Sequence, residues 1–72
     1  MPRFVMDYYY RPTRDAAAEL RESVAIHAPG RSIAIETALR RAVALRADWF
    51  ELRDPARPDT PFYNSKVTNH GA

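Results

Sequence analysis

The chain has 72 residues, which is enough for one domain, and a chain of this size buries only about 60% of its unfolded surface. It contains no cysteine, which excludes disulfide bonds and thiolate metal sites, so packing or a partner must stabilise the core. The net charge is +2, with 11 basic and 9 acidic residues interspersed, and no long basic run marks a nucleic-acid-binding segment.

Arginine provides 10 of the 11 basic residues. Arginine suits the recognition of phosphate and carboxylate groups. Arginine and alanine also rise together in GC-rich genomes, for reasons unrelated to binding. The composition therefore leaves open whether the arginine content is functional or a compositional bias.

The segment from Arg3 to Arg11 alternates between two faces, which predicts a first strand ending at Pro12. One face of this strand should carry mostly large apolar side chains, namely Phe4, Met6, Tyr8 and Tyr10. The other face should carry Val5, Asp7 and Tyr9.

An alanine-rich stretch follows, and Thr13 can cap a helix there. Residues 16–22 contain no strand-forming residue, so their propensity predicts a helix. Residues 23–28 fit two interpretations, because their apolar positions continue the helical stripe but also alternate. They either end the helix or form a strand that pairs with the first one.

The residues after Gly30 have a helical period, with Ser32 as the predicted N-cap. The predicted core-facing positions are Ile35, Ala38, Leu39, Ala42, Val43 and Leu45. The opposite face is polar and includes Arg40 and Arg41, with Glu36 and Arg40 forming an i,i+4 pair. Arg46 lies in the last turn, where it can be solvated or can cap the helix end.

Alternation resumes after Ala47 and predicts a second strand over Trp49 to Arg53, with Phe50 and Leu52 on its core face. Residues 55–61 contain three prolines and predict a stiff loop. Phe62 to Val67 then completes a hairpin. Residues 68–72 are polar and small, and we expect a flexible tail.

These elements predict an α+β fold, in which the N-terminal strand and a C-terminal hairpin form a short antiparallel sheet packed on one or two helices. Residues 1–67 should form the single domain. No segment is typical of a signal peptide or a membrane span, so we expect a cytoplasmic protein.

Catalysis is not expected from this sequence. The only histidines are His27, near the end of an element, and His70, in the predicted tail. A glycine-rich phosphate loop, a paired-histidine metal motif and a nucleophile elbow are all absent from the sequence. We therefore expect a binding protein without a metal or a cofactor.

The candidate binding residues are aromatic and arginine side chains that point away from the predicted core. They are Tyr9, Arg40, Arg41, Trp49 and Arg53. Exposed Tyr and Trp beside Arg are typical of protein interfaces, and aromatic residues on a sheet can also stack on the bases of single strands. The sequence favours a protein partner, leaves direct nucleic-acid binding as the less favoured alternative, and allows a homodimer.

Parts of this sequence resemble two known groups of proteins. Residues Gly30, Arg31 and Ser32, with ALRR at residues 38–41, resemble the ribbon-helix-helix family. That resemblance implies a strand-helix-helix order and a dimeric DNA-binding repressor whose N-terminal strand enters the major groove. We rank it second, because Pro29 interrupts the turn between the helices and residues 49–67 have no counterpart.

The second resemblance is to small α+β proteins of phages and mobile elements, including some anti-CRISPR proteins. It is carried by residues along the helix and its exit, namely Ser32, Glu36, Ala38, Leu39, Ala42, Ala47, Asp48 and Trp49. This resemblance implies an inhibitor or adaptor that acts without catalysis, by occluding a surface of a larger nucleic-acid-handling complex.

Overall fold

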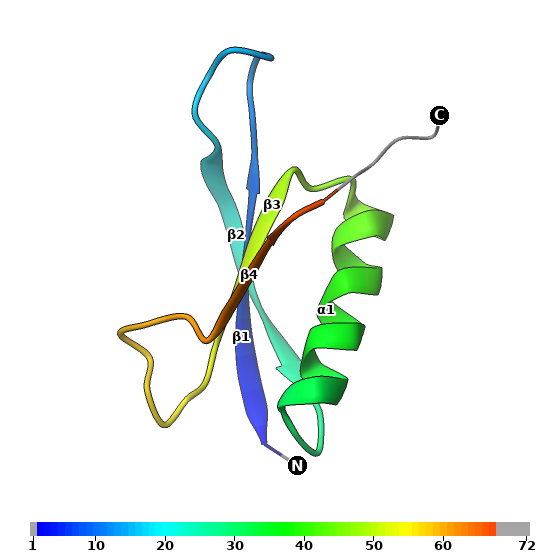
Figure 1. The fold of residues 1–72 in the computed structure, drawn as a ribbon, viewed down its shortest axis with the longest axis vertical. Helices are drawn as coiled ribbons and strands as arrows, with labels where there is room; N and C mark the ends of the chain where they lie inside the picture. Colours follow the sequence, from blue (N-terminus) through cyan, green and yellow to red (C-terminus); the bar gives the residue numbers. More distant parts are fainter. Residues whose placement is uncertain (1, 68–72) are drawn as a thin grey trace.

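The computed structural model describes residues 2–67, and the predicted tail at residues 68–72 lies outside them. The elements follow the order β1 (Arg3–Tyr10), β2 (Glu19–His27), α1 (Arg31–Leu45), β3 (Trp49–Arg53) and β4 (Tyr63–Lys66) (Figure 1). The strands form one antiparallel sheet of 4 strands in the order β2-β1-β3-β4. The predicted α+β class with a short antiparallel sheet is confirmed.

The helix lies along one face of the sheet only (Figure 1). Within residues 2–67 no second helix covers the other face. The strands β1 and β3 occupy the centre of the sheet, and β2 and β4 form its edges. The sheet therefore has one covered face and one face open to solvent.

Strand β2 corrects the predicted helix at residues 16–22. Residues 16–18 belong to the loop, and Glu19–His27 is a strand whose Ile26 pairs with Phe4. The helix preference of alanine, leucine, glutamate and arginine amounts to only tenths of a kcal/mol per residue. Pairing of eight β2 residues with β1, together with burial of Ile26, overrides it.

The interpretation of residues 23–28 as a strand is confirmed for residues 23–27, which lie in β2. A register shift occurs between Tyr8 and Tyr9, whose partners on β2 are Glu22 and Leu20. The extra residue is Arg21, which marks a β-bulge on an edge strand. The order strand, strand, helix also differs from the strand-helix-helix order of the ribbon-helix-helix family, and the N-terminal strand lies inside the sheet.

The buried face of α1 differs from the predicted one. Its buried residues are Ala34, Ala38 and Ala42, whereas Leu39 and Val43 are 36% and 54% exposed. Alanine allows the helix backbone to approach the sheet closely, so the larger side chains are displaced to the flanks. Burial is thus confirmed for Ala38 and Ala42, and the predictions for Leu39, Val43 and the exposed Leu45 are wrong.

Both ends of α1 are set by backbone geometry. Gly30 is the N-cap and provides no side-chain hydrogen bond, so the prediction of Ser32 as the N-cap is wrong. At the other end Arg46 is left-handed, with φ 58°. Its N–H donates to Val43 O at 3.1 Å, and the N–H of Ala47 donates to Ala42 O at 3.0 Å, the Schellman pattern. The chain therefore turns tightly into β3.

The core lies between the covered face and α1, and the predicted inward positions of β1 and β3 are confirmed there. The buried apolar residues are Phe4, Met6, Tyr8, Ile26, Ala28, Ala34, Ala38, Ala42, Ala47, Phe50 and Leu52. Phe62 and Tyr63 pack on this cluster from the hairpin end. The large side chains come from the strands and the small ones from the helix, which explains how so short a chain encloses a core.

The loop between β3 and β4 is held to the rest of the domain. The side chain of Asp54 accepts the N–H of Ala56 at 2.9 Å and an N–H of Arg31 at 3.1 Å. The guanidinium of Arg31 also lies 4.8 Å from the centre of the Phe62 ring. These contacts fix the loop against the start of α1.

Candidate functional site

The face of the sheet that α1 leaves uncovered is called the open face below. Because paired residues of neighbouring strands point to the same side, the strand registers define its members. Those from the central strands are Arg3, Val5, Asp7, Tyr9, Trp49, Glu51 and Arg53. Those from the edge strands are Leu20, Ser23, Ala25, His27, Asn64 and Lys66.

One half of the open face is organised around Asp7, which is 5% exposed although no helix covers it. Nη2 of Arg53 lies 2.9 Å from each carboxylate oxygen, and the hydroxyl of Ser23 donates to Oδ1 at 2.5 Å. Nη1 of Arg53 donates to Pro58 O at 3.3 Å. Arg53 is therefore held within the fold, where it neutralises Asp7 and links β3 to the loop.

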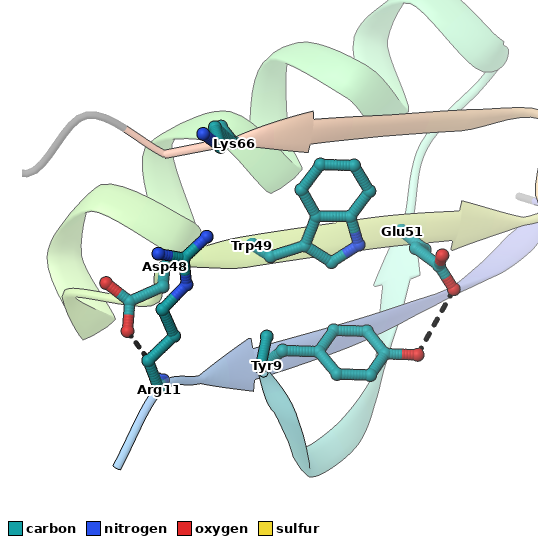
Figure 2. A pocket seen from close by; sticks show the side chains of 7 residues that line it. Tyr9, Arg11, Asp48, Trp49, Glu51 and Lys66 are labelled. Atoms are coloured by element: carbon teal, nitrogen blue, oxygen red, sulfur yellow. Dashed lines mark hydrogen bonds between the residues drawn. The ribbon is translucent and has the colours of Figure 1, made fainter. Parts of the chain in front are cut away.

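The other half of the open face forms a shallow hollow of about 210 Å³ (Figure 2). Its floor contains Tyr9 and Trp49, which are directly paired between β1 and β3. In Figure 2 the two rings lie side by side over their strands, with Lys66 beyond Trp49. Both aromatic side chains are half-buried, so each ring keeps part of its surface open to solvent.

The Tyr9 ring is anchored at its hydroxyl, which donates to Oε1 of Glu51 at 3.2 Å. Burial, and then the negative charge of Glu51, raise the pKa of Tyr9 above its ordinary value of 10.0. The phenol therefore stays protonated at neutral pH and keeps its role as donor. The hydrogen bond fixes the direction of the ring along the sheet.

The charges around the hollow are unequally engaged. The two carboxylates have partners, since Glu51 accepts from Tyr9 and Oδ2 of Asp48 accepts the backbone N–H of Arg11 at 2.8 Å. Neither Lys66 nor the guanidinium of Arg11 forms an ion pair with another described residue. The hollow is therefore lined by two carboxylates that are hydrogen-bonded to neutral donors and by two cations that form no ion pair within residues 2–67.

The predicted binding residues fall on two surfaces. Tyr9, Trp49 and Arg53 share the open face, whereas Arg40 and Arg41 are exposed on α1, which packs on the opposite side of the sheet (Figure 1). Arg40 also forms an exposed ion pair with Glu36 at 2.6 Å. The fold therefore brings three of the predicted residues together on the open face and places the other two on α1.

The sequence did not single out Arg11 or Lys66. The signal for Lys66 was the register of the C-terminal hairpin, because pairing with Trp49 places both side chains on one face. Arg11 is the last residue of the predicted first strand and follows β1 directly in the structure, and its side chain contributes to the rim of the hollow.

Within residues 2–67, no three His, Cys, Asp or Glu side chains are grouped closely enough to hold a metal ion. The helix of this region is too short and too polar to cross a bilayer. No protein-family model, curated protein or solved structure matches the chain. The functional assignment therefore depends on the geometry of the chain's own surface.

Proposed function

We propose that this protein is a non-enzymatic binding protein, an inhibitor or adaptor of the phage or mobile-element type, related in mode of action to anti-CRISPR proteins. It occludes a surface of a larger nucleic-acid-handling protein complex in the cytoplasm. Its contact surface is the open face, and the central contact residues are Tyr9 and Trp49.

The observation that carries this proposal is the pair of half-exposed rings on a face that no other described element covers. Tyrosine and tryptophan supply large contact areas and are enriched among residues that dominate binding energy. Fixing Tyr9 through Glu51 and Arg53 through Asp7 reduces the entropy that these side chains lose on binding. The face is thus rigid before a partner arrives.

The helix surface supports a binding role less well. Arg40 and Arg41 are exposed cations, and the ion pair of Arg40 with Glu36 is of the surface type that contributes about 0.3–0.5 kcal/mol. They stay candidates for a peripheral contact. The proposal assigns them no central role.

The test is quantitative affinity capture from a lysate of the source cells, with three forms of the protein. These are the wild type, the open-face variant Y9S/W49S, and the helix variant R40E/R41E. We expect the wild type and R40E/R41E to recover the same nucleic-acid-handling complex, and Y9S/W49S to lose at least about 90% of it, as removal of two central aromatic residues implies.

Circular dichroism of each variant provides the folding control, since all four substituted residues lie outside the buried core. Loss of capture with R40E/R41E and retention with Y9S/W49S would place the interface on α1 and contradict the proposal. Turnover of a small molecule with no macromolecule recovered would contradict the binding role itself. A dimer that binds duplex DNA with steep salt dependence would instead favour a repressor.

A further inference from the structure

We infer that the hollow at Tyr9 and Trp49 binds single-stranded nucleic acid, with a base on the exposed ring surface and the phosphate backbone along Arg11 and Lys66. This inference rests on the proposed function in one respect, since both use the open face for binding. It adds the chemical class of the ligand, which is the single strand that a nucleic-acid-handling complex exposes.

The floor of the hollow is formed by two aromatic rings. Tyr9 and Trp49 lie side by side on adjacent strands, so they offer a ring surface parallel to the sheet (Figure 2). Bases of a single strand stack on such aromatic surfaces, because every base has a flat π-face. A duplex keeps its bases stacked on one another, and its rigid groove does not match a shallow hollow of about 210 Å³.

The hollow is lined by both acidic and basic side chains. The carboxylate of Asp48 already accepts the backbone N–H of Arg11, whereas Lys66 and the Arg11 guanidinium have no ion-pair partner among residues 2–67. Lys66 pairs in register with Trp49, and both side chains line the hollow (Figure 2). These two cations offset the two carboxylates of the hollow, Asp48 and Glu51, so the phosphate contacts are local ones at Arg11 and Lys66.

Glu51 gives the hollow a preference among the bases. Glu51 lies at the end of the hollow next to the Tyr9 hydroxyl, and that hydroxyl occupies Oε1. Its second oxygen accepts no hydrogen bond from another side chain within residues 2–67, and a carboxylate accepts well from the exocyclic amine of cytosine. Thymine presents a carbonyl oxygen at the equivalent position and would meet the carboxylate unfavourably. The site should therefore prefer cytosine to thymine.

Trp49 is the single tryptophan of the chain, so its fluorescence reports on this hollow alone. The experiment titrates the full-length protein with oligo(dC), oligo(dT), a DNA duplex and polyglutamate, at several salt concentrations. We expect quenching by oligo(dC) and at least about fivefold weaker binding of oligo(dT). Two phosphate contacts imply a slope of log K against log salt of about −1.4.

The variants separate stacking from charge. Y9L should weaken oligo(dC) binding by about 5- to 150-fold, the range for loss of one stacking ring. K66Q should reduce the magnitude of the salt slope by about 0.7. E51Q should reduce the preference for oligo(dC) over oligo(dT). The matched control R40Q removes an exposed cation from α1 and should change none of these values.

Each other outcome overturns the inference. Quenching by polyglutamate that equals or exceeds quenching by oligo(dC) would identify an acidic-peptide site, and tighter binding of the duplex would identify a groove-binding surface. Equal effects of K66Q and R40Q would show that charge acts without a defined site. Absence of binding to any oligonucleotide, with capture of a partner still lost in Y9S/W49S, would refute this inference and leave the proposed function in place.

Discussion

The two faces of the sheet are built from alternate residues of the same strands, yet they differ in almost every property. On the covered face, Phe50 and Leu52 are fully buried against the alanine surface of α1. On the open face, their neighbours Trp49, Glu51 and Arg53 are half-buried and carry polar or aromatic groups. The period of two in a strand places a core residue and an open-face residue at a spacing of one position.

The division is not complete, because the open face contains one buried charged group. Asp7 is 5% exposed and is satisfied by Arg53 and Ser23. This cluster stabilises the centre of the sheet from the open side and leaves the neighbouring half of the face, at Tyr9 and Trp49, as the accessible surface. We therefore expect substitutions on the two faces to change the stability of the domain by different amounts and for different reasons.

The largest expected effect separates two adjacent residues of β3. Phe50→Ala removes a fully buried ring and should lower the free energy of unfolding by about 3–5 kcal/mol, enough to unfold much of a domain this small. Trp49→Ala removes a larger but half-buried ring and should cost about 1 kcal/mol. Urea denaturation followed by circular dichroism measures both. Equal losses would contradict the division of the faces.

The next effect tests the buried charge on the open face. Asp7→Ala leaves the guanidinium of Arg53 without its carboxylate, and we expect a loss of about 2 kcal/mol, below the range for fully buried pairs because Arg53 is 33% exposed. Glu51→Ala, on the same face, should cost less than about 1 kcal/mol. A double-mutant cycle of Asp7→Ala with Arg53→Ala should show coupling between the two residues. Independent effects would exclude Asp7 as the organising group.

Substitution by glycine should change the stability in opposite directions at Arg46 and Arg41, and each change should be smaller than the loss at Asp7. Arg46→Gly relieves a left-handed backbone conformation that costs a non-glycine residue about 1–2 kcal/mol, so it should raise the stability by about 1 kcal/mol. Arg41→Gly introduces glycine into the middle of α1 and should lower the stability by about 1 kcal/mol. Thermal denaturation compares them. A loss at both positions would show that the end of α1 differs from the Schellman turn.

The smallest effect is pH-dependent and concerns the loop after β3. The backbone N–H of Ala56, and then Arg31, hold the pKa of Asp54 below its ordinary value of 3.8. Because the pKa of Asp54 is lower in the folded state than in the unfolded state, its carboxylate stabilises the fold at pH values above the unfolded-state pKa. This stabilisation is lost as the pH falls through the folded-state pKa. Asp54→Ala should therefore lower the melting temperature slightly at neutral pH, with a deficit that shrinks in acid. A melting-temperature deficit that is the same at neutral and acidic pH would show that the charge of Asp54 is not its cause.

Most strands were predictable because each alternates within its own short segment. Strand β2 was the exception, since residues 19–22 favour a helix locally and become a strand only through pairing with β1. The helix was predictable in position but not in its buried face. Periodicity identifies the apolar side of a helix, whereas contact with a flat sheet selects small residues such as Ala38 over Leu39.

The site was predictable to the extent that it depends on alternation within a strand. Tyr9, Trp49 and Arg53 were assigned to a common face by period alone, and the register between β1 and β3 confirms that placement. Arg40 and Arg41 could not be placed relative to them, because a helix pattern does not reveal which side of the sheet the helix covers. Lys66 required the register of β3 with β4, which depends on the length of the intervening loop.

The central claim is that the open face, and not the helix surface, meets the partner. A photoreactive benzoylphenylalanine placed at Asn64, an exposed open-face residue paired with Glu51, or at Arg40 as the matched helix control, tests it in the source cells. We predict a cross-linked product from position 64 and none above background from position 40. Cross-linking from position 40, with none from position 64, would contradict the account.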